Sequence, residues 1–399
     1  MRILIVSQYF YPEQFQINEI APELVKRGHK VTVLTGLPNY PHGEIYDGYE
    51  QAYKDIENIN GVDVIRCKMH PRKSGAVNLI RNYLSFWRNA TKKAKKLKEE
   101  YDIVLSYQLS PIMSAKPAVA YAKKHKTPLL LYCLDIWPES AQAQIKNKNS
   151  LPYKLIAKLS KNIYAACDHI AVTSRPFIEY LSEENGIDKE KMSYIPQHAD
   201  KRYLDEDFST SASDTVNFMY AGNIGKGQLL EVIINAVAEI KDNIGFKVHI
   251  VGDGSQRAQL EELVKTLDVQ DKVVFYGNQK REDMVGYYKM ADALLLTLRG
   301  NNFVGNTMPG KLQAYMSTGK PIFAAINGAA AEVISEAECG ACVPAGDSHG
   351  LAEIMSDFIN NPSKYAKSGE NARKYFAEHF TLDIYIEELE KRMEAMING

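Results

Sequence analysis

The apolar positions of the first half form short runs separated by longer, helix-like patterns. The runs have strand length and lie at residues 2–7, 30–35, 62–67, 103–106, 128–132, 168–174 and 193–196. Continuous apolar runs of this length are typical of strands buried on both faces of a parallel sheet. Between the first two runs, Ile20, Leu24 and Val25 share one face of a segment that Gly28 ends, which indicates a helix. The pattern predicts a Rossmann-like α/β domain.

The second half repeats this pattern. Strand-like runs lie at 215–221, 246–251, 272–276, 291–298 and 322–325, and helical patterns at 229–240 and 382–396. The stretch 201–214 is acidic and rich in Ser and Thr, with few apolar residues, as in a linker. We therefore expect an α/β protein with two Rossmann-like domains at 1–200 and 215–380, a linker at 201–214, and a final helix at 381–399.

The composition and net charge of the chain change this prediction little. Hydrophobic residues make up 45% of the chain and the net charge is −1, so nothing calls for nucleic acid as a partner. Cys339 and Cys342 have no second cysteine pair at zinc-site spacing, and we expect reduced thiols and no metal. The N-terminus lacks a signal-peptide pattern, and no apolar run reaches the roughly 20 residues of a membrane span. We expect a cytoplasmic protein.

The segment 68–98 is the most biased part of the chain, because all its charged residues are Lys or Arg. Leu79, Ile80, Phe86 and Trp87 are interleaved with them. A basic segment with aromatic residues can lie on an anionic bilayer, which favours peripheral attachment to the inner face of the cell membrane. A solvated helix face or a nucleic-acid patch is the alternative.

Two stretches of the second half can hold an anion. A glycine-rich loop, GNIGKGQ at 222–228, follows the first strand of that half, and its backbone N–H groups and Lys226 can approach a phosphate. Pro309 and Gly310 open a helix whose first turn contains Lys311, so its dipole also favours an anion. Neither stretch has Walker-loop spacing, and no G-x-G-x-x-G follows the first strand, so NAD and FAD are discounted.

The first half has candidate residues after its strands. Asp135 follows the strand 128–132 and lies two residues before Trp137, which suits a catalytic carboxylate; a helix cap is the alternative. The loops at 8–16 and 36–49 are rich in aromatic and polar residues and suit a ring-shaped polar partner, or are packed surface loops. Arg175 lies at the tip of another strand.

The order of these pieces resembles glycosyltransferase family four, which has the GT-B fold of two Rossmann-like domains facing across a cleft. The matching pieces are GHKVTVLTG, SYIPQHAD, YAGNIGKGQ, VGDGSQRAQLEEL, VVFYGN, YYKMADALLL, GKLQAYMSTGKPI and AAAEVI. The stretches PNYPHG, DIWPES and IPQHAD are similar to bacterial transferases that build O-antigen and capsule.

This resemblance implies a retaining, metal-independent transferase that uses no cofactor. It implies a nucleotide diphosphate sugar donor, uridine being the first expectation, and a glycan or polyprenyl-diphosphate-linked acceptor. Asp135 and Lys226 are the catalytic candidates. The diphosphate candidates are Gly222, Asn223, Gly225, Lys226, Pro309, Gly310 and Lys311; the nucleoside candidates are Gly252, Gly254, Tyr276 and Gln313. The donor-sugar candidates are Asn306 and Thr307, and the acceptor candidates are Gln14, Asn39, His42 and Arg175. The final helix is expected to return to the first domain.

Two positions depart from the family pattern. The family's Glu-x7-Glu pair falls on Asn306 and Ala314, neither of which is acidic, and its roles pass to Gln313 and to Asn306 or Thr307. Asn223 stands where a basic residue is frequent. Two alternatives therefore remain: a non-hydrolysing sugar-nucleotide epimerase, and a nucleotide-sugar binding subunit that has lost catalysis.

Overall fold

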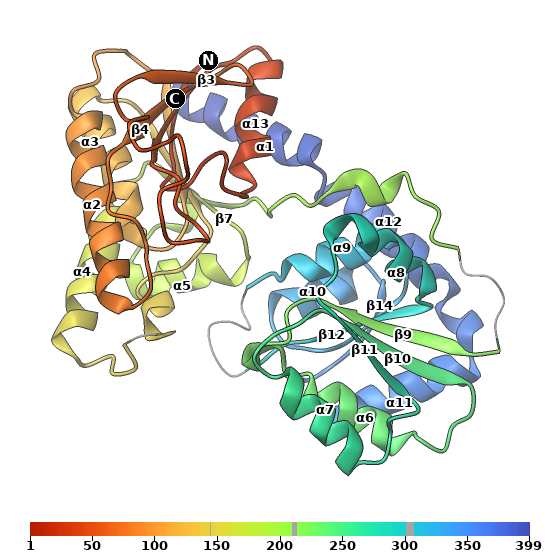
Figure 1. Ribbon diagram of the computed structural model, residues 1–399. Helices are drawn as coiled ribbons and strands as arrows, with labels where there is room; N and C mark the ends of the chain where they lie inside the picture. Colours follow the sequence, from red (N-terminus) through yellow and green to blue (C-terminus); the bar gives the residue numbers. More distant parts are fainter. Residues whose placement is uncertain (144, 210–213, 301–306) are drawn as a thin grey trace. The chain divides into compact units, whose positions relative to one another are not determined.

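The computed structural model describes residues 1–143, 145–209, 214–300 and 307–399 of the chain. Two compact units are present (Figure 1). One comprises Met1–Ile195 together with Ile386–Gly399, and the other comprises Pro196–Tyr385. Each unit is described by itself below, as the N-terminal unit and the C-terminal unit.

The N-terminal unit is built on an eight-stranded sheet within the described residues, with the order β3-β4-β2-β1-β5-β6-β7-β8. Its strands are β1 (Arg2–Val6), β2 (Lys30–Gly36), β3 (Ile56–Ile59), β4 (Val62–Cys67), β5 (Ile103–Gln108), β6 (Leu129–Cys133), β7 (His169–Val172) and β8 (Met192–Tyr194). Only the pairing of β3 with β4 is antiparallel among these strands. The order reverses between β1 and β5, so the loops after these two strands diverge.

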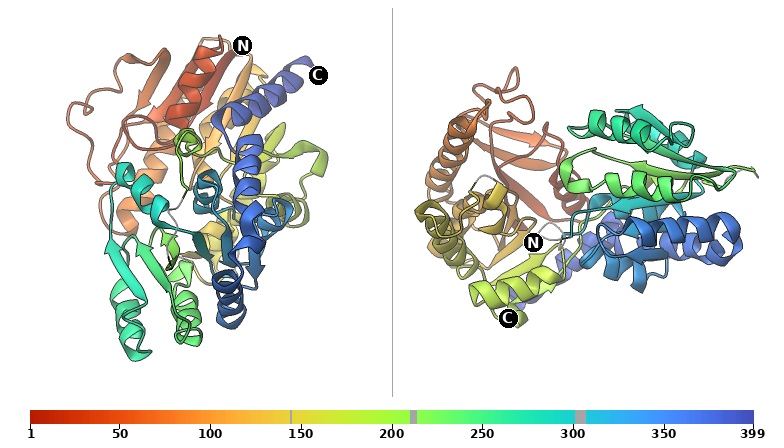
Figure 2. Two further views of the ribbon diagram at one scale, coloured as in Figure 1. Left: turned by 90° about the vertical axis from the view of Figure 1, so that its right-hand side faces the viewer. Right: turned by 90° about the horizontal axis from the view of Figure 1, so that it is seen from below.

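Helices flank this sheet. They are α1 (Ile17–Lys26), α2 (Ala76–Ala94), α3 (Lys116–His125), α4 (Leu151–Tyr164) and α5 (Pro176–Asn185). In Figure 1, α2, α3 and α4 lie together along one side of the unit. The helix α13 (Leu382–Asn398) belongs to this unit from Ile386 onward. The carboxylate of Glu390 in this helix lies 3.1 Å from the guanidinium Nη1 of Arg27 and 2.7 Å from Nε2 of His29. Both chain termini belong to this unit (Figures 1 and 2).

The C-terminal unit has a six-stranded parallel sheet in the described residues, with the order β11-β10-β9-β12-β13-β14. The strands are β9 (Val216–Ala221), β10 (Phe246–Val251), β11 (Val273–Gly277), β12 (Ala293–Thr297), β13 (Ile322–Ala325) and β14 (Gly340–Val343). In chain order this is 3-2-1-4-5-6, the doubly wound arrangement. The reversal lies between β9 and β12.

Alternating side chains of this sheet enter two different cores. On one face Phe218, Val248 and Leu295 pack with α6 (Glu231–Glu239), α7 (Arg257–Thr266) and α11 (Ser348–Asn360). On the other face Met219 and Leu294 pack with α8 (Met284–Met290), α9 (Gly310–Thr318), α10 (Ala329–Glu336) and α12 (Ala366–His379). Because successive strand residues point to opposite faces, continuous apolar runs are what this arrangement requires.

The prediction of two Rossmann-like α/β domains with parallel sheets is confirmed. The ranges predicted for β4, β10 and β13 agree with the structure residue by residue. No strand was predicted at β3 or β14, and no helix at α3, α4, α5, α7, α8, α11 or α12. In the expected linker, Tyr203 and Phe208 are buried against Tyr288, with ring centroids 5.5 and 6.4 Å from its ring. Residues 201–209 thus pack within the C-terminal unit.

Candidate functional site

The carboxyl ends of β9 and β12 mark the main candidate site of the C-terminal unit. Ligands of open α/β sheets bind where the strand order reverses, because the loops there turn away from each other and leave a crevice. The loop 222–228 follows β9 directly, and α9 begins beyond β12. The hydroxyl of Tyr315 joins the two elements, since it accepts from the N–H of Ala221 at 2.8 Å and donates to the carbonyl of Ala221 at 3.0 Å.

Two glycines let three segments meet closely at this site. Gly222 has φ +149°, and a Cβ there would lie 2.3 Å from Cε of Lys311. Gly252, after β10, has φ +136°, and a Cβ there would lie 1.9 Å from the carbonyl oxygen of Gly222. A side chain at Gly222 would displace the Lys311 side chain, and one at Gly252 would push its segment away from the backbone of Gly222. These two glycines are therefore needed for the close approach of the segments.

Lys311 is the best-defined charge of this site. Its ammonium donates to the hydroxyl of Tyr220 at 2.6 Å and to the side-chain oxygen of Gln228, and it lies 4.7 Å from the centroid of the Tyr220 ring. Burial lowers the pKa of Lys311 to about 8. No carboxylate in the described residues forms an ion pair with it. A half-buried cation without a counter-charge is prepared for an anionic ligand.

The other diphosphate candidates surround Lys311 in different ways. Lys226 and Asn223 are exposed, and Lys226 lies on a single turn of 3-10 helix, 226–228. Pro309 is the N-cap residue of α9, and Gly310 is its exposed first residue. The side-chain amide of Asn223 would lie 2.7 Å from a Cβ at Gly225. These residues give the site a loop of backbone N–H groups and an exposed lysine beside the half-buried one.

The nucleoside and sugar candidates are more varied. Gly252 and Gly254 lie in the loop after β10, where the N–H of Ile224 donates to the carbonyl of Asp253 at 2.9 Å. The hydroxyl of Tyr276 is paired with His249 Nδ1 at 2.9 Å. Gln313 is only 3% exposed, and its amide donates to the backbone carbonyl of Gln197, so its amide group already has a partner.

The family's Glu-x7-Glu pair falls on Asn306 and Ala314, and Thr307 is the other residue predicted to take over a role of this pair. Asn306 lies outside the described residues, and Thr307 is partly buried just before α9. Ala314, in α9, is partly buried as well.

In the N-terminal unit the neighbouring parallel strands β1 and β2 bring the candidate acceptor loops together at their carboxyl ends. Glu13 was not among the predicted site residues, although it is the only acidic residue among the first 18 residues of the chain. Its side chain is 1% exposed and accepts from the N–H groups of Asn39 and Tyr40, both at 2.8 Å. Burial raises the pKa of Glu13 to about 7. Glu13 thus joins the loop after β1 to the loop after β2.

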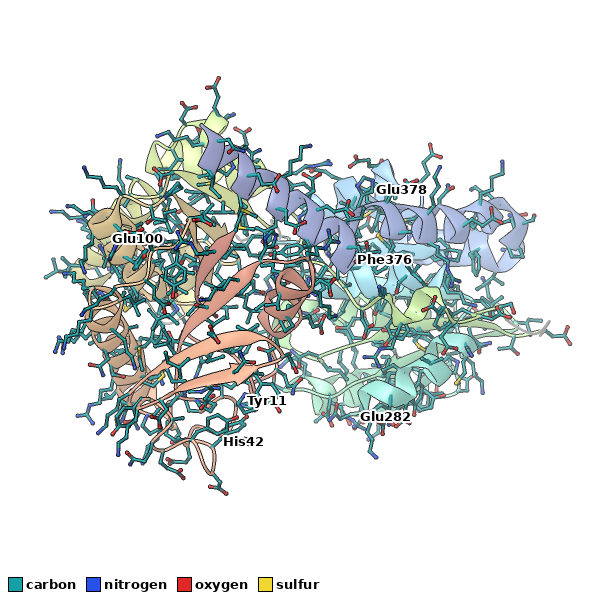
Figure 3. The ribbon with its side chains drawn as sticks, turned by 90° about the horizontal axis from the view of Figure 1, so that it is seen from above. Tyr11, His42, Glu100, Glu282, Phe376 and Glu378 are labelled. Atoms are coloured by element: carbon teal, nitrogen blue, oxygen red, sulfur yellow. The ribbon has the colours of Figure 1, made fainter. Side chains whose placement is uncertain are left out.

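The predicted acceptor residues of these loops lie at different depths. Asn39 is fully buried, and its side-chain oxygen accepts from the N–H of Arg72 at 2.9 Å and from Asn82 at 3.1 Å. Gln14 is exposed. His42 is exposed too, on the outer part of its loop, with its ring 5.6 Å from that of Tyr46. Figure 3 shows His42 and Tyr11 on these loops. Asn39 is therefore a framework residue, whereas Gln14 and His42 can reach a ligand.

Asp135 lies where the sequence predicts, just after β6. Its carboxylate accepts from the hydroxyl of Ser110 at 2.5 Å, and that hydroxyl in turn accepts from the indole N–H of Trp137 at 3.2 Å. This fixes one carboxylate oxygen, as a general base requires. Arg175 is exposed after β7, with its guanidinium 5.1 Å from the centroid of the Tyr194 ring.

Neither a metal-ligand cluster nor a membrane-spanning helix is found in the described residues. Residues 1–143, 145–209, 214–300 and 307–399 contain no cluster of three His, Cys, Asp or Glu side chains suited to a metal ion. None of the helices in these ranges combines the length and hydrophobicity that crossing a bilayer requires.

Comparison with known proteins covers both units. Residues 15–201 match the model described as Glycosyltransferase Family 4, and residues 205–375 match that described as Glycosyl transferases group 1. The chain is 24% identical over 402 residues to "O-antigen chain mannosyltransferase C" of Escherichia coli, covering 97% of this chain and 96% of that protein. It is 26% identical to "N-acetyl-alpha-D-glucosaminyl L-malate synthase" of Bacillus anthracis, over 48% of each.

Among solved structures, the chain resembles Anabaena HepE, which was crystallised in complex with UDP. The TM-score is 0.71 at 15% sequence identity, covering 99% of this chain and 100% of the other. At this identity the likeness concerns the fold.

Proposed function

Because the chain belongs to glycosyltransferase family four, we propose that it moves a sugar from a nucleotide diphosphate sugar to a glycan acceptor in the synthesis of a bacterial surface polysaccharide. It is a glycosyltransferase of the GT-B fold. The observation that carries the donor proposal is Lys311, a half-buried cation beside a glycine loop, with no carboxylate partner in the described residues.

The donor diphosphate contacts Lys311, Lys226 and the N–H groups of the loop 222–228 and of the first turn of α9. When the bond to the sugar breaks, negative charge grows on the leaving nucleotide. Fixed cations and N–H groups stabilise that charge without having to reorganise, which lowers the barrier. We propose uridine as the base, supported by the UDP bound to HepE. Gly252, Gly254 and Tyr276 lie on the adjacent loops and are the proposed nucleoside contacts.

We assign Asp135 to the acceptor hydroxyl, which it orients and deprotonates. The hydrogen bond from Ser110 leaves the second carboxylate oxygen of Asp135 for this purpose. The proposed reaction retains the anomeric configuration of the donor sugar, as in the enzymes that the sequence resembles. Proton NMR of the product should show the configuration of the donor; an inverted product would overturn this part.

The first experiment is a thermal-shift panel of UDP, GDP, dTDP and ADP, each with and without magnesium. A nucleotide at ~100 times its dissociation constant adds roughly 2.7 kcal/mol of stability. We expect one clear responder, UDP, with or without the metal, and no response in Lys311→Met. Lys272→Met is the matched control, because Lys272 lies at the opposite end of the sheet and donates to the carbonyl of Asn243 at 3.1 Å. An unresponsive wild type would contradict the donor proposal.

We also propose that the N-terminal unit docks on an anionic membrane, where a polyprenyl-diphosphate-linked acceptor is found. Val77 and Ile80 at the start of α2 are 64% and 56% exposed, next to the exposed Arg81. Leu151 and Leu155 at the start of α4 are 71% and 59% exposed. Both helices contact the same short segment, 112–115, and lie on the same side of the unit in Figure 1. Apolar side chains rimmed by cations suit a bilayer interface.

Liposome flotation tests this docking. We expect the protein to float with anionic vesicles at low salt and to be released at high salt, because the charge contribution is screened. The double variant Val77→Ser with Ile80→Ser should bind less, whereas Ile244→Ser, which removes an exposed apolar side chain of the C-terminal unit, should bind like the wild type. Equal recovery with uncharged vesicles would rule out the electrostatic part.

A further inference from the structure

Arg72 lies among the loops at the carboxyl ends of β1, β2 and β4. Its backbone N–H donates to the buried side chain of Asn39, which also accepts from Asn82 of α2. The carbonyl of His70 accepts from Asn82 at 2.7 Å. On the other side, the N–H of Lys73 donates to the carbonyl of Gly43 at 2.8 Å, so the backbone is held both before and after Arg72.

Tyrosine rings surround the half-buried Arg72 side chain. The guanidinium carbon lies 5.2 Å from the centroid of the Tyr40 ring and 5.9 Å from that of Tyr83. One of its N–H groups donates to the hydroxyl of Tyr9 at 3.0 Å, and the Tyr9 ring is stacked on Phe15 at 4.9 Å. Aromatic faces orient a guanidinium without neutralising it. The charge of Arg72 is therefore positioned but not cancelled.

Arg66 shows what a structural arginine looks like at the same edge of the sheet. It is fully buried, forms an ion pair with Glu57 at 3.0 Å, and donates to the carbonyls of Gly36 and Tyr11. Arg72, by contrast, forms no ion pair with any carboxylate in the described residues. A guanidinium has five N–H donors in a planar fork. The guanidinium of Arg72 therefore has N–H groups left to donate to a ligand.

Asp135 follows β6, at the same carboxyl edge of the parallel sheet as the loops that hold Arg72. Burial and then the charge of Asp135 raise the pKa of Tyr83, the same tyrosine that flanks Arg72. A ligand that bridges the two therefore meets a cation at one end and a carboxylate at the other. An acceptor sugar with its reacting hydroxyl at Asp135 would place a second substituent toward Arg72.

We propose that Arg72 binds a phosphate group of the acceptor, so that the enzyme selects phosphate-linked or diphosphate-linked glycans. This rests on the proposed glycosyl transfer. A guanidinium matches phosphate oxygens by paired, charge-assisted hydrogen bonds. A lipid diphosphate and a soluble sugar phosphate offer the same chemistry to Arg72, and the choice of acceptor in the assay distinguishes them.

The test compares three forms of one acceptor glycan: linked to polyprenyl diphosphate, as a soluble 1-phosphate, and as a neutral methyl glycoside. Arg72→Gln should raise the acceptor KM roughly 10- to 100-fold for the phosphorylated forms, the usual worth of a charged hydrogen bond. It should leave the neutral glycoside, the donor KM and the nucleotide thermal shift unchanged. Arg72→Lys should recover part of the loss. Arg2→Gln, which removes an exposed arginine at the opposite end of the same sheet, is the matched control.

A second measurement needs no variant to fold. Inorganic phosphate should inhibit the wild type competitively with the phosphorylated acceptor and not with the donor. Competition with the donor alone, or an unchanged acceptor KM in a folded Arg72→Gln protein, would overturn the assignment while leaving glycosyl transfer intact. Failure of the proposed function itself would be seen separately, as the absence of any nucleotide response.

Discussion

Glu13 is buried and Lys311 is half-buried; desolvation disfavours the charged form of each, but the two residues have different roles. Glu13 has backbone N–H partners and joins two loops of the N-terminal unit. Lys311 has neutral partners and keeps its charge available at the end of the sheet in the C-terminal unit. Desolvation raises the pKa of the acid and lowers that of the base. Each shift makes a pH-dependent prediction.

Glu13→Gln should gain stability relative to the wild type as the pH rises. The pKa of Glu13 is about 7 in the folded protein against 4.5 as its ordinary value, so the folded state binds more protons between these limits and loses stability as the pH rises through them. Between pH 5 and pH 8 the relative gain should be about 2 kcal/mol. Urea denaturation at both pH values measures it. Glu44→Gln, at an exposed side chain, is the control; a relative loss at pH 8 would refute the sign.

Nucleotide affinity should depend on the protonation of Lys311. The free protein has a Lys311 pKa of about 8, and an anionic diphosphate binds the protonated form. Affinity should be steady below this pH and fall about tenfold between pH 7 and pH 9, by proton linkage. Calorimetric titration at several pH values measures this. In Lys311→Met the affinity should be weak and should lose this pH dependence; an unchanged slope in that variant would assign the titration to another group.

Among the elements, the glycine loop after β9 decides how closely α9 can approach. Gly222→Ala should weaken nucleotide binding tenfold or more, because its Cβ would displace the Lys311 side chain and its φ is unfavourable for alanine, at a cost of roughly 1–3 kcal/mol. Gly227→Ala is the matched control in the same loop, since a Cβ there meets nothing within 4 Å. Thermal shift with the responding nucleotide measures both. Equal responses of the two variants would show that close approach is unimportant.

The elements also show where sequence patterns suffice. Buried parallel strands such as β10 and β13 were predicted well, because their apolar runs and flanking glycines are local signals. The edge strand β3 was not predicted, because Ile56 is 64% exposed and the short run IENI has no regular alternation of apolar and polar residues. The last strand, β14, is partly buried throughout and contains Gly340 and Cys342. These two edge strands lack the burial that makes a strand visible in sequence.

For the whole molecule, two compact units with separate cores should unfold in separable steps. The nucleotide that responds in the thermal-shift panel should raise only the transition of the unit formed by residues 196–385. At ~100 times the dissociation constant, the added 2.7 kcal/mol corresponds to a rise of roughly 5–10 °C for a unit of this size. Scanning calorimetry measures it, with Lys311→Met to identify the transition. A single peak that moves as a whole would show that the units unfold together.

The sequence by itself determined the two Rossmann-like domains and the order of their motifs. It also singled out the glycine loop, Lys226, Lys311 and Asp135 as the residues with chemistry. These inferences work because strand and helix periodicity, glycine at tight turns and polar residues after buried strands are all properties of short stretches of chain.

The tertiary structure alone decided which of these residues are buried and which face one another. Gln313 is in the interior, and Lys311 has no carboxylate partner in the part of the chain that the structure describes. Glu13 bridges two loops, and Arg72 lies among tyrosines from distant stretches of sequence. Such facts depend on segments tens of residues apart that meet only when parallel strands bring their carboxyl ends to one edge of the sheet. Burial and pairing of charges arise from that meeting, and local sequence carries no record of them.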